Sequence, residues 1–182
     1  MWIPGRSGDP VAILKIHHAP DPILAICLPS IEVVTGEIRR LARDMIETMY
    51  AAGGVGLAAN QVGKPFRLFV ANPYPGRGNE IVVLNPVLLH GGSRVRLEEG
   101  CLSLPGVSAV VPRCSTVRIQ GLTLEGAPRV LEGRGFLARI FQHEMDHLNG
   151  LTYPDRLPWL SRRRLLARYG RQQRELARIH VA

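Results

Sequence analysis

Residues 135–148 read Gly-Phe-Leu-Ala-Arg-Ile-Phe-Gln-His-Glu-Met-Asp-His-Leu, which is the most informative segment of the chain. Its apolar residues indicate a helix that begins near the glycine, and the Asn-Gly pair that follows is a helix-ending signal. The stretch contains an HExxH pattern, in which Glu144 lies between His143 and His147. Imidazoles four residues apart lie one turn apart on one helix face, so both reach a single metal ion. The sequence therefore predicts a metal-binding helix here.

Other elements are predicted on both sides of this helix. Apolar residues at three- and four-residue spacing predict a helix over residues 35–52, which ends at a Gly-Gly pair. A third helix is predicted after Pro158. Short β-branched runs separated by turn residues predict mostly antiparallel strands, at residues 66–71, 80–84, 94–97, 107–111 and 116–122. Because no βαβ alternation is present, we expect an α+β fold, with mostly antiparallel sheets packed around the central HExxH helix.

Composition and charge predict one catalytic domain with a basic extension. The chain has 182 residues, 46% hydrophobic and 21% charged, and a formal net charge of +8. Such a composition is too apolar for a disordered chain, and no apolar run is long enough to span a membrane. Residues 161–182 hold seven arginines and one acid, a net charge of +6, whereas the preceding residues have a net charge of only +2. We therefore predict a catalytic domain over residues 1–158 and a basic helical extension over residues 159–182.

Cysteine usage and the N-terminus indicate the compartment. Cys27, Cys101 and Cys114 form no Cys-x-x-Cys pair, which argues against a disulfide framework and fits a reducing environment. The first residues lack the apolar core of a signal peptide. We expect a cytoplasmic monomer without a membrane segment.

The third metal ligand is predicted upstream of the helix. In the extended protease pattern HExxHxxGxxH the next ligand would fall at residue 153, which is a tyrosine. The later acids, Asp155 and Glu175, lie in no convincing ligand motif. Cys101 is the best candidate, because Gly100 before it and a Pro-Gly pair after it predict a tightly shaped loop.

The remaining cysteines and histidines are assigned no role. We expect Cys27 and Cys114 to be packed or exposed without special chemistry. His17, His18 and His90 lack an oriented context, and we expect surface or structural positions for them.

A site of two histidines and one thiolate suits zinc, iron, cobalt or nickel. Such a metal ion lowers the pKa of a bound water, and Glu144 is placed to accept its proton and return it to a leaving amine. The residues thus indicate metal-assisted hydrolysis of an amide-like bond, as in a metallo-amidase or a protease. A non-enzymatic ribosome-binding protein with a structural metal is the alternative, and its metal would need four protein ligands.

Three segments together resemble peptide deformylase. They are Gly-Val-Gly-Leu-Ala-Ala-Asn-Gln at residues 54–61, Glu-Gly-Cys-Leu-Ser at 99–103 and Gln-His-Glu-Met-Asp-His-Leu at 142–148, and they occur in the family's order. The resemblance, which extends from about residue 10 to 157, implies removal of the formyl group from the formyl-methionine of nascent polypeptides. It also implies one divalent metal ion, usually Fe2+, with Zn2+, Ni2+ or Co2+ as substitutes.

The resemblance also implies roles for individual residues. Cys101, His143 and His147 would bind the metal, and Glu144 would be the general acid and base. The Gln61 side-chain amide and the backbone N–H of Leu102 would stabilise the formyl oxygen, as neutral donors aimed at a developing oxyanion. A glutamine that only bonds its own loop is the alternative for Gln61.

Substrate contacts are expected beside these groups. Val55–Gly56 and Gly100 would pair with the peptide as an added strand. Val55, Leu102, Ile140 and the ring edge of His143 are candidates for the methionine pocket.

The chain departs from the family pattern at two places. Asn60 stands where many members have proline or threonine. Val107-Ser108-Ala109 stands where some bacterial members have an arginine, so the peptide contacts should differ there. The Leu-Pro-Gly after Ser103 looks more like the type 1 branch.

The basic extension has two interpretations. Some deformylases use a basic C-terminal helix to sit near the ribosomal exit tunnel, and this resemblance predicts ribosome contact through residues 161–182. The alternative is a helix whose arginines are simply solvated.

Overall fold

The computed structural model describes residues 11–74 and 76–179. Three α-helices are present in this part of the chain: α1 (Gly36–Ala51), α2 (Phe136–Leu148) and α3 (Trp159–Ile179). Three short 3-10 helices span Pro22–Ala25, Ala59–Val62 and Tyr153–Arg156. The strands are β1 (Gly56–Ala58), β2 (Leu68–Ala71), β3 (Ile81–Gly91), β4 (Arg94–Cys101), β5 (Leu104–Cys114), β6 (Thr116–Leu122) and β7 (Pro128–Arg134).

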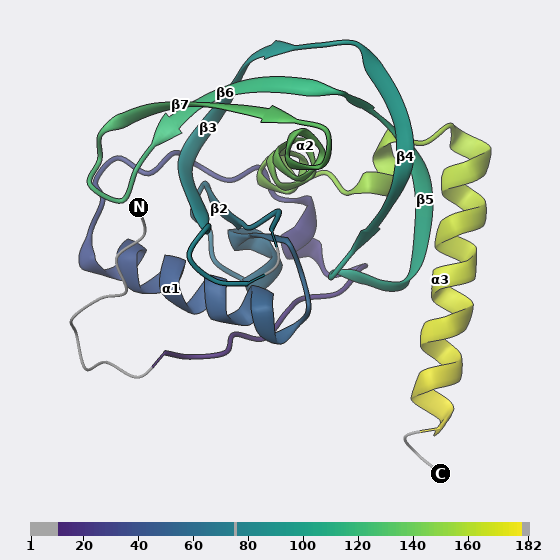
Figure 1. The fold of residues 1–182 in the computed structure, drawn as a ribbon. Helices are drawn as coiled ribbons and strands as arrows, with labels where there is room; N and C mark the ends of the chain where they lie inside the picture. The colour runs from purple at the N-terminus through teal and green to yellow at the C-terminus, as the bar shows by residue number, and fades with distance from the viewer. Residues whose placement is uncertain (1–10, 75, 180–182) are drawn as a thin grey trace.

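The strands form two antiparallel sheets that curve around α2. Five strands lie in the order β1-β2-β3-β6-β7, and β4 and β5 form a separate hairpin. In Figure 1, α2 lies at the centre, with β3, β6 and β7 on one side and β4 and β5 on the other. This arrangement confirms the predicted α+β fold with antiparallel sheets.

The main core lies between α1, the five-stranded sheet and α2. Thr35 caps α1, because its Oγ1 accepts a hydrogen bond from the backbone N–H of Ile38. Met45 and Met49 on α1 are fully buried, as the spacing predicts. Phe141 of α2 packs against Phe69 of β2, with 5.8 Å between the ring centroids. The apolar face of α2 therefore fixes the helix, and with it the polar residues of HExxH.

A smaller second core joins α3 to the β4–β5 hairpin. Leu165 and Tyr169 of α3 pack with Val107, Val111 and Tyr153, and all five side chains are buried. Leu176 lies on the same side of the helix further along but is 43% exposed. Figure 1 shows α3 outside β5, with its C-terminal half extending beyond the hairpin. The two buried anchors of α3, Leu165 and Tyr169, therefore lie in the N-terminal part of the helix.

Local sequence signals located most elements. Strand β6 has the predicted bounds, whereas β3, β4 and β5 extend several residues beyond the predicted runs. Two strands were not predicted, β1 and β7. Strand β1 has three residues, and β7 is a mostly exposed edge strand with charged and proline residues. Edge strands carry such residues as protection against further pairing, so their hydrophobic pattern is weak.

Among the described residues, no helix combines the length and the apolar character that a membrane crossing requires.

Candidate active site

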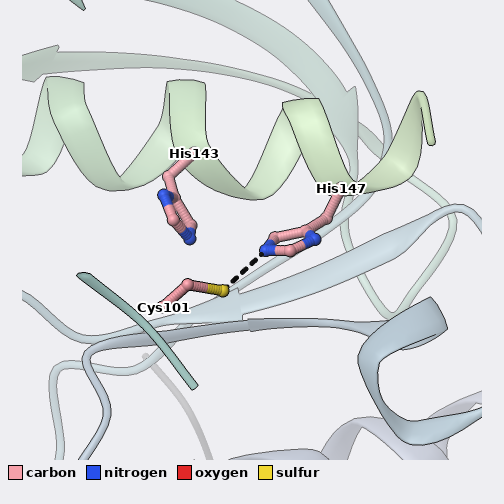
Figure 2. A group of neighbouring side chains, drawn as sticks. All are labelled: Cys101, His143 and His147. Carbon is pink, nitrogen blue, oxygen red and sulfur yellow. Dashed lines mark hydrogen bonds between the residues drawn. The ribbon is translucent and has the colours of Figure 1, made fainter. Parts of the chain in front are cut away.

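The structure brings Cys101, His143 and His147 together. One ligand atom from each residue lies within 4.8 Å of the others, and this is the one such group of three found in the described part of the chain. Both imidazoles extend from α2 toward the cysteine, which comes from a separate strand (Figure 2). Sγ of Cys101 lies 3.2 Å from Nε2 of His147. The three residues thus share one small polar centre.

Cys101 is held at the end of β4 by a two-residue turn. Leu102 and Ser103 form this turn, and the backbone N–H of Ser103 lies 3.4 Å from the Cys101 sulfur. The sequence placed the turn at Pro105-Gly106, but both residues lie within β5, so that prediction was wrong. Gly106 has a φ of +77°, and a Cβ added to it would lie only 1.9 Å from Nε2 of Gln172. Glycine is therefore needed at this position of β5, because the backbone has a positive φ and the Gln172 side chain of α3 leaves no room for a Cβ.

A buried carboxylate orients His143. Oε2 of Glu99 lies 3.2 Å from Nδ1 of His143, which leaves Nε2 as the nitrogen available to a metal ion. Both oxygens of Glu99 also accept hydrogen bonds from Arg113, each at 2.9 Å. Burial alone would raise the pKa of Glu99, but the hydrogen bonds from His143 and Arg113 outweigh it and lower the pKa to about 2. Glu99 is therefore ionised and fixes the ring.

Arg113 links this carboxylate to α2. Its Nη1 donates to Oδ2 of Asp146 at 2.6 Å, and Nε of Arg156 donates to the same oxygen at 3.0 Å. Arg113, Glu99 and Asp146 are all buried. Sequence reasoning assigned no role to these residues, although each lies in or beside a motif that it singled out. The sequence signal that could have identified them is the presence of charged residues within otherwise apolar segments, since such residues are rarely buried unless they are paired.

The protonation behaviour of Cys101 and His143 indicates a site that suits a cation. Burial raises the pKa of Cys101, but the charges and hydrogen bonds of His147 and His143 lower it well below the usual thiol value. Burial lowers the pKa of His143, and the hydrogen bonds with Cys101 and Glu99 outweigh it and raise that pKa. A half-buried thiolate facing two imidazole nitrogens is the donor set of a divalent transition metal. The residues present therefore fit a metal ion.

Glu144 lies beside this centre and is almost completely buried. Desolvation raises its pKa to about 7, although the nearby His143 and His147 oppose the shift. Its carboxylate occupies the space in front of Gly56, where an added Cβ would lie only 2.3 Å from Oε1. Gly56 is thus required to make room for the acid, a reason that the sequence did not indicate.

The amide of Gln61 has a fixed orientation. Its Oε1 accepts a hydrogen bond from the backbone N–H of Ala58 at 2.8 Å. Its Nε2 therefore points the other way, donating to Oγ of Ser103 at 3.1 Å and lying 3.5 Å from the sulfur of Cys101. The two interpretations of Gln61 are compatible, because the oxygen bonds the local backbone while the nitrogen faces the site.

A cavity of about 370 Å³ opens beside the centre. Its walls include almost every residue predicted for the site, and His147 lies deeper. Phe136 and Arg139 also line it, and neither was predicted. The lining residues include Val55, Gly56, Gln61, Gly100, Cys101, Leu102, Ile140, His143 and Glu144. Strand β1 is an edge strand of its sheet and β4 pairs only with β5, so both have an unpaired edge for an extended ligand.

The other candidates lie elsewhere. Cys27 is exposed, and Cys114 packs against the main core. The backbone N–H of His17 donates to the carbonyl of Gln61 at 2.7 Å, which is a structural role. Neither cysteine belongs to the metal-ligand group.

Two histidines from an HExxH helix, a cysteine from a hairpin and a buried glutamate beside a cavity define a metallohydrolase. Comparison with known proteins identifies which kind. Residues 13–163 match the polypeptide deformylase family. The peptide deformylase of Aquifex aeolicus is 41% identical over 153 residues, which cover 82% of this chain and 90% of that protein.

Solved structures agree with this match. The peptide deformylase of Legionella pneumophila superposes with a TM-score of 0.87 at 37% identity, over 92% of this chain and 99% of that one. The peptide deformylase of Thermus thermophilus gives a TM-score of 0.82 at 45% identity, over 90% and 99%. The chain belongs to the polypeptide deformylase family, metal-dependent hydrolases that remove N-formyl groups from nascent peptides.

Proposed function

We propose that this chain removes the formyl group of N-terminal formyl-methionine with one divalent metal ion held by Cys101, His143 and His147. The observation that carries the proposal is the convergence of one sulfur and two ring nitrogens within 4.8 Å of one another. When bound, the metal supplies a Lewis acid that lowers the pKa of water at the site. Three protein ligands leave a coordination position open, whereas a structural site would be closed by a fourth.

Glu144 is proposed as the general acid and base. A pKa of about 7 lets its carboxylate accept a proton from water and later give a proton to the departing amine nitrogen. The carboxylate is confined between α2 and Gly56, so its position is fixed before the substrate arrives. This confinement reduces the reorganisation that proton transfer would otherwise require.

Gln61 and Leu102 are proposed as donors to the formyl oxygen. The Nε2 of Gln61 faces the Cys101 turn because its partner oxygen is held by Ala58. Leu102 directly follows Cys101 in the turn, so its backbone N–H is carried by the same rigid segment. Neutral donors fixed in this way stabilise negative charge as it develops on the oxygen.

The cavity is proposed to hold the methionine side chain. Val55, Leu102 and Ile140 supply apolar surface, and the peptide backbone would pair with Val55–Gly56 on one side and Gly100 on the other. Residues 107–109 stand where some bacterial members have an arginine, and within them Ser108 donates from Oγ to Glu98 at 2.6 Å. Residues 107–109 of this chain therefore present no positive charge to the substrate residues that follow the formyl-methionine.

We propose Fe2+ as the metal in the cell, following the family, with Zn2+, Ni2+ or Co2+ able to replace it. A mixed nitrogen and sulfur donor set accepts all four ions. The reducing cytoplasm, where we place the enzyme as a monomer, would keep both the iron and the Cys101 thiolate reduced.

The catalytic domain is proposed to span residues 1–158, and the extension 159–182 to contact the ribosome through its arginines. Residues 1–10 and 180–182 lie outside the described part of the chain. All the arginines of α3 are exposed, whereas Leu165 and Tyr169 on the same helix are buried in the second core. A basic helix of this kind is suited to phosphate-rich RNA.

An anaerobic assay of the Fe2+-loaded protein on a formyl-methionyl peptide tests the proposed roles. Gln61→Leu should lower kcat by about 10² to 10³, the usual loss for one oxyanion donor, without loss of metal. Cys101→Ser should lose the metal itself. Gln120→Leu, at an exposed position of β6 outside the site, is the control and should leave kcat unchanged. Full activity of the Gln61 variant would remove that assignment.

A further inference from the structure

His147 has one ring nitrogen without a partner. Its Nε2 faces Cys101 at 3.2 Å, whereas its Nδ1 is buried and has no hydrogen bond to any residue that the structure describes. A histidine that binds metal through one nitrogen normally donates the N–H of the other to a protein acceptor or to water, which fixes the ring and its tautomer. Glu99 serves His143 in this way. His147 lacks an equivalent bond in the structure.

Asn60 supplies a buried acceptor next to this histidine. The side chain of Asn60 is completely buried, and its Nδ2 lies 2.6 Å from the backbone oxygen of His147. Because a carbonyl oxygen only accepts hydrogen bonds, the amide nitrogen must occupy that position. The orientation of the amide is thereby set, and its Oδ1 is buried without a donor.

The two unpaired atoms are chemically complementary. One is an imidazole nitrogen that carries a proton when Nε2 binds metal, the other is an amide oxygen, and a hydrogen bond already joins their residues. Buried polar groups are rarely left unsatisfied in native proteins, and one ordered water is enough to join two of them.

We propose that Asn60 is a positioning residue for His147. With metal bound, its Oδ1 accepts the Nδ1–H of His147, directly or through one ordered water. The same side chain holds the His147 carbonyl through Nδ2, so one amide fixes both the ring and the backbone of this ligand. The inference rests on the proposed metal site, and it adds an outer partner for the second histidine.

Zinc affinity and histidine NMR of the diamagnetic Zn2+-loaded protein test the proposal. Asn60→Leu should bind zinc about 10 to 100 times more weakly in chelator competition, the usual loss when an outer-shell partner is removed. Asn60→Asp retains an acceptor for the ring but loses the donor to the His147 carbonyl, so its zinc affinity should fall between those of the parent and the leucine variant. The parent should show a slowly exchanging Nδ1–H resonance from His147, retained with aspartate and lost with leucine.

Asn72→Leu is the matched control. Asn72 is another buried asparagine, and its Nδ2 donates to Tyr50 and to the carbonyl of Gly76 outside the metal centre. Its replacement should leave zinc affinity within about twofold of the parent, because it touches no metal ligand or outer partner. Equal losses of affinity in Asn72→Leu and Asn60→Leu would assign the effect to general destabilisation and overturn the proposal.

Two further outcomes separate this inference from the proposed function. If the parent binds zinc and deformylates peptides while Asn60→Leu keeps the parent's zinc affinity and His147 resonance, the inference alone is wrong. If the parent itself binds no zinc, the metal site fails and the inference with it.

Discussion

Helices α2 and α3 are both rich in charged residues, yet they use charge in opposite ways. Arg139, Glu144 and Asp146 of α2 are buried. Over its described length α3 buries only Leu165 and Tyr169, and none of its arginines is buried. One helix brings charge into the protein, and the other presents it to the surroundings.

The difference in burial predicts different effects of substitution in the two helices. A buried charge must be paired by groups from other elements, as Asp146 is paired by Arg113 and Arg156. Substitutions around α2 should therefore change catalysis or folding strongly. Exposed charges are screened by solvent and contribute little to stability, so substitutions on the outer face of α3 should act only through a partner.

The largest effect is expected at Glu144 of α2. Glu144→Gln keeps the shape of the side chain but cannot accept or return a proton. We expect kcat to fall by about 10² to 10⁴, the usual contribution of general acid–base catalysis. Metal content, measured by elemental analysis, should stay equal to the parent's. A variant that retains both metal and full kcat would contradict the proposed role.

Substitution of Arg113, which pairs with the buried Glu99 and Asp146, should lower the stability of the protein. Arg113→Met leaves Glu99 and Asp146 without their shared cation, so the free energy of unfolding should fall by about 3–5 kcal/mol in denaturant titration. Arg134→Met is the matched control, because the Arg134–Glu132 pair is exposed and should contribute less than about 1 kcal/mol. Similar losses in the two variants would show that burial does not distinguish the pairs.

The anchored half of α3 should contribute to stability through its apolar contacts. Tyr169→Ala removes a buried ring from the second core and should cost about 3 kcal/mol of unfolding free energy. Tyr169→Phe should cost little, because the buried hydroxyl has no hydrogen-bond partner among residues 11–74 and 76–179. If phenylalanine destabilised as much as alanine, the hydroxyl and not the ring would be the important group.

The smallest effect on the body is expected from the outer half of α3. Replacing Arg171, Arg174 and Arg178 together by glutamine should change the free energy of unfolding by less than about 0.5 kcal/mol per site. Activity on free peptides should be unchanged, while salt-sensitive co-sedimentation with ribosomes should weaken. Pelleting equal to the parent's would remove the ribosome proposal. Truncation after Leu160 is a poorer test, since it also removes Leu165 and Tyr169.

The sequence predicted what is encoded locally. Helices α1, α2 and α3 follow from their apolar spacing and end signals, and the HExxH pattern located two of the three metal-ligand candidates. The third, Cys101, followed from elimination and from the family resemblance. Strand β7 was not found, because its edge position leaves it mostly exposed and polar.

Contacts between segments that are far apart in the chain could not be predicted from local sequence patterns. Arg113 meets carboxylates from β4 and α2, and no local pattern specifies that meeting. Asn60 was noted only as a departure from the family, although its amide contacts the backbone of His147. Gly56 makes room for a glutamate that lies far along the chain. Such pairings are set by packing and become visible only in the folded protein.

Formate release by the Fe2+-loaded protein under anaerobic conditions tests the proposed deformylase activity most directly. Formyl-methionyl, acetyl-methionyl and internally cleavable peptides would be compared, with the metal-free protein as the control. We expect stoichiometric formate from the formyl peptide alone, and none without metal. Cleavage of internal bonds, or no formate from the metal-loaded protein, would contradict it.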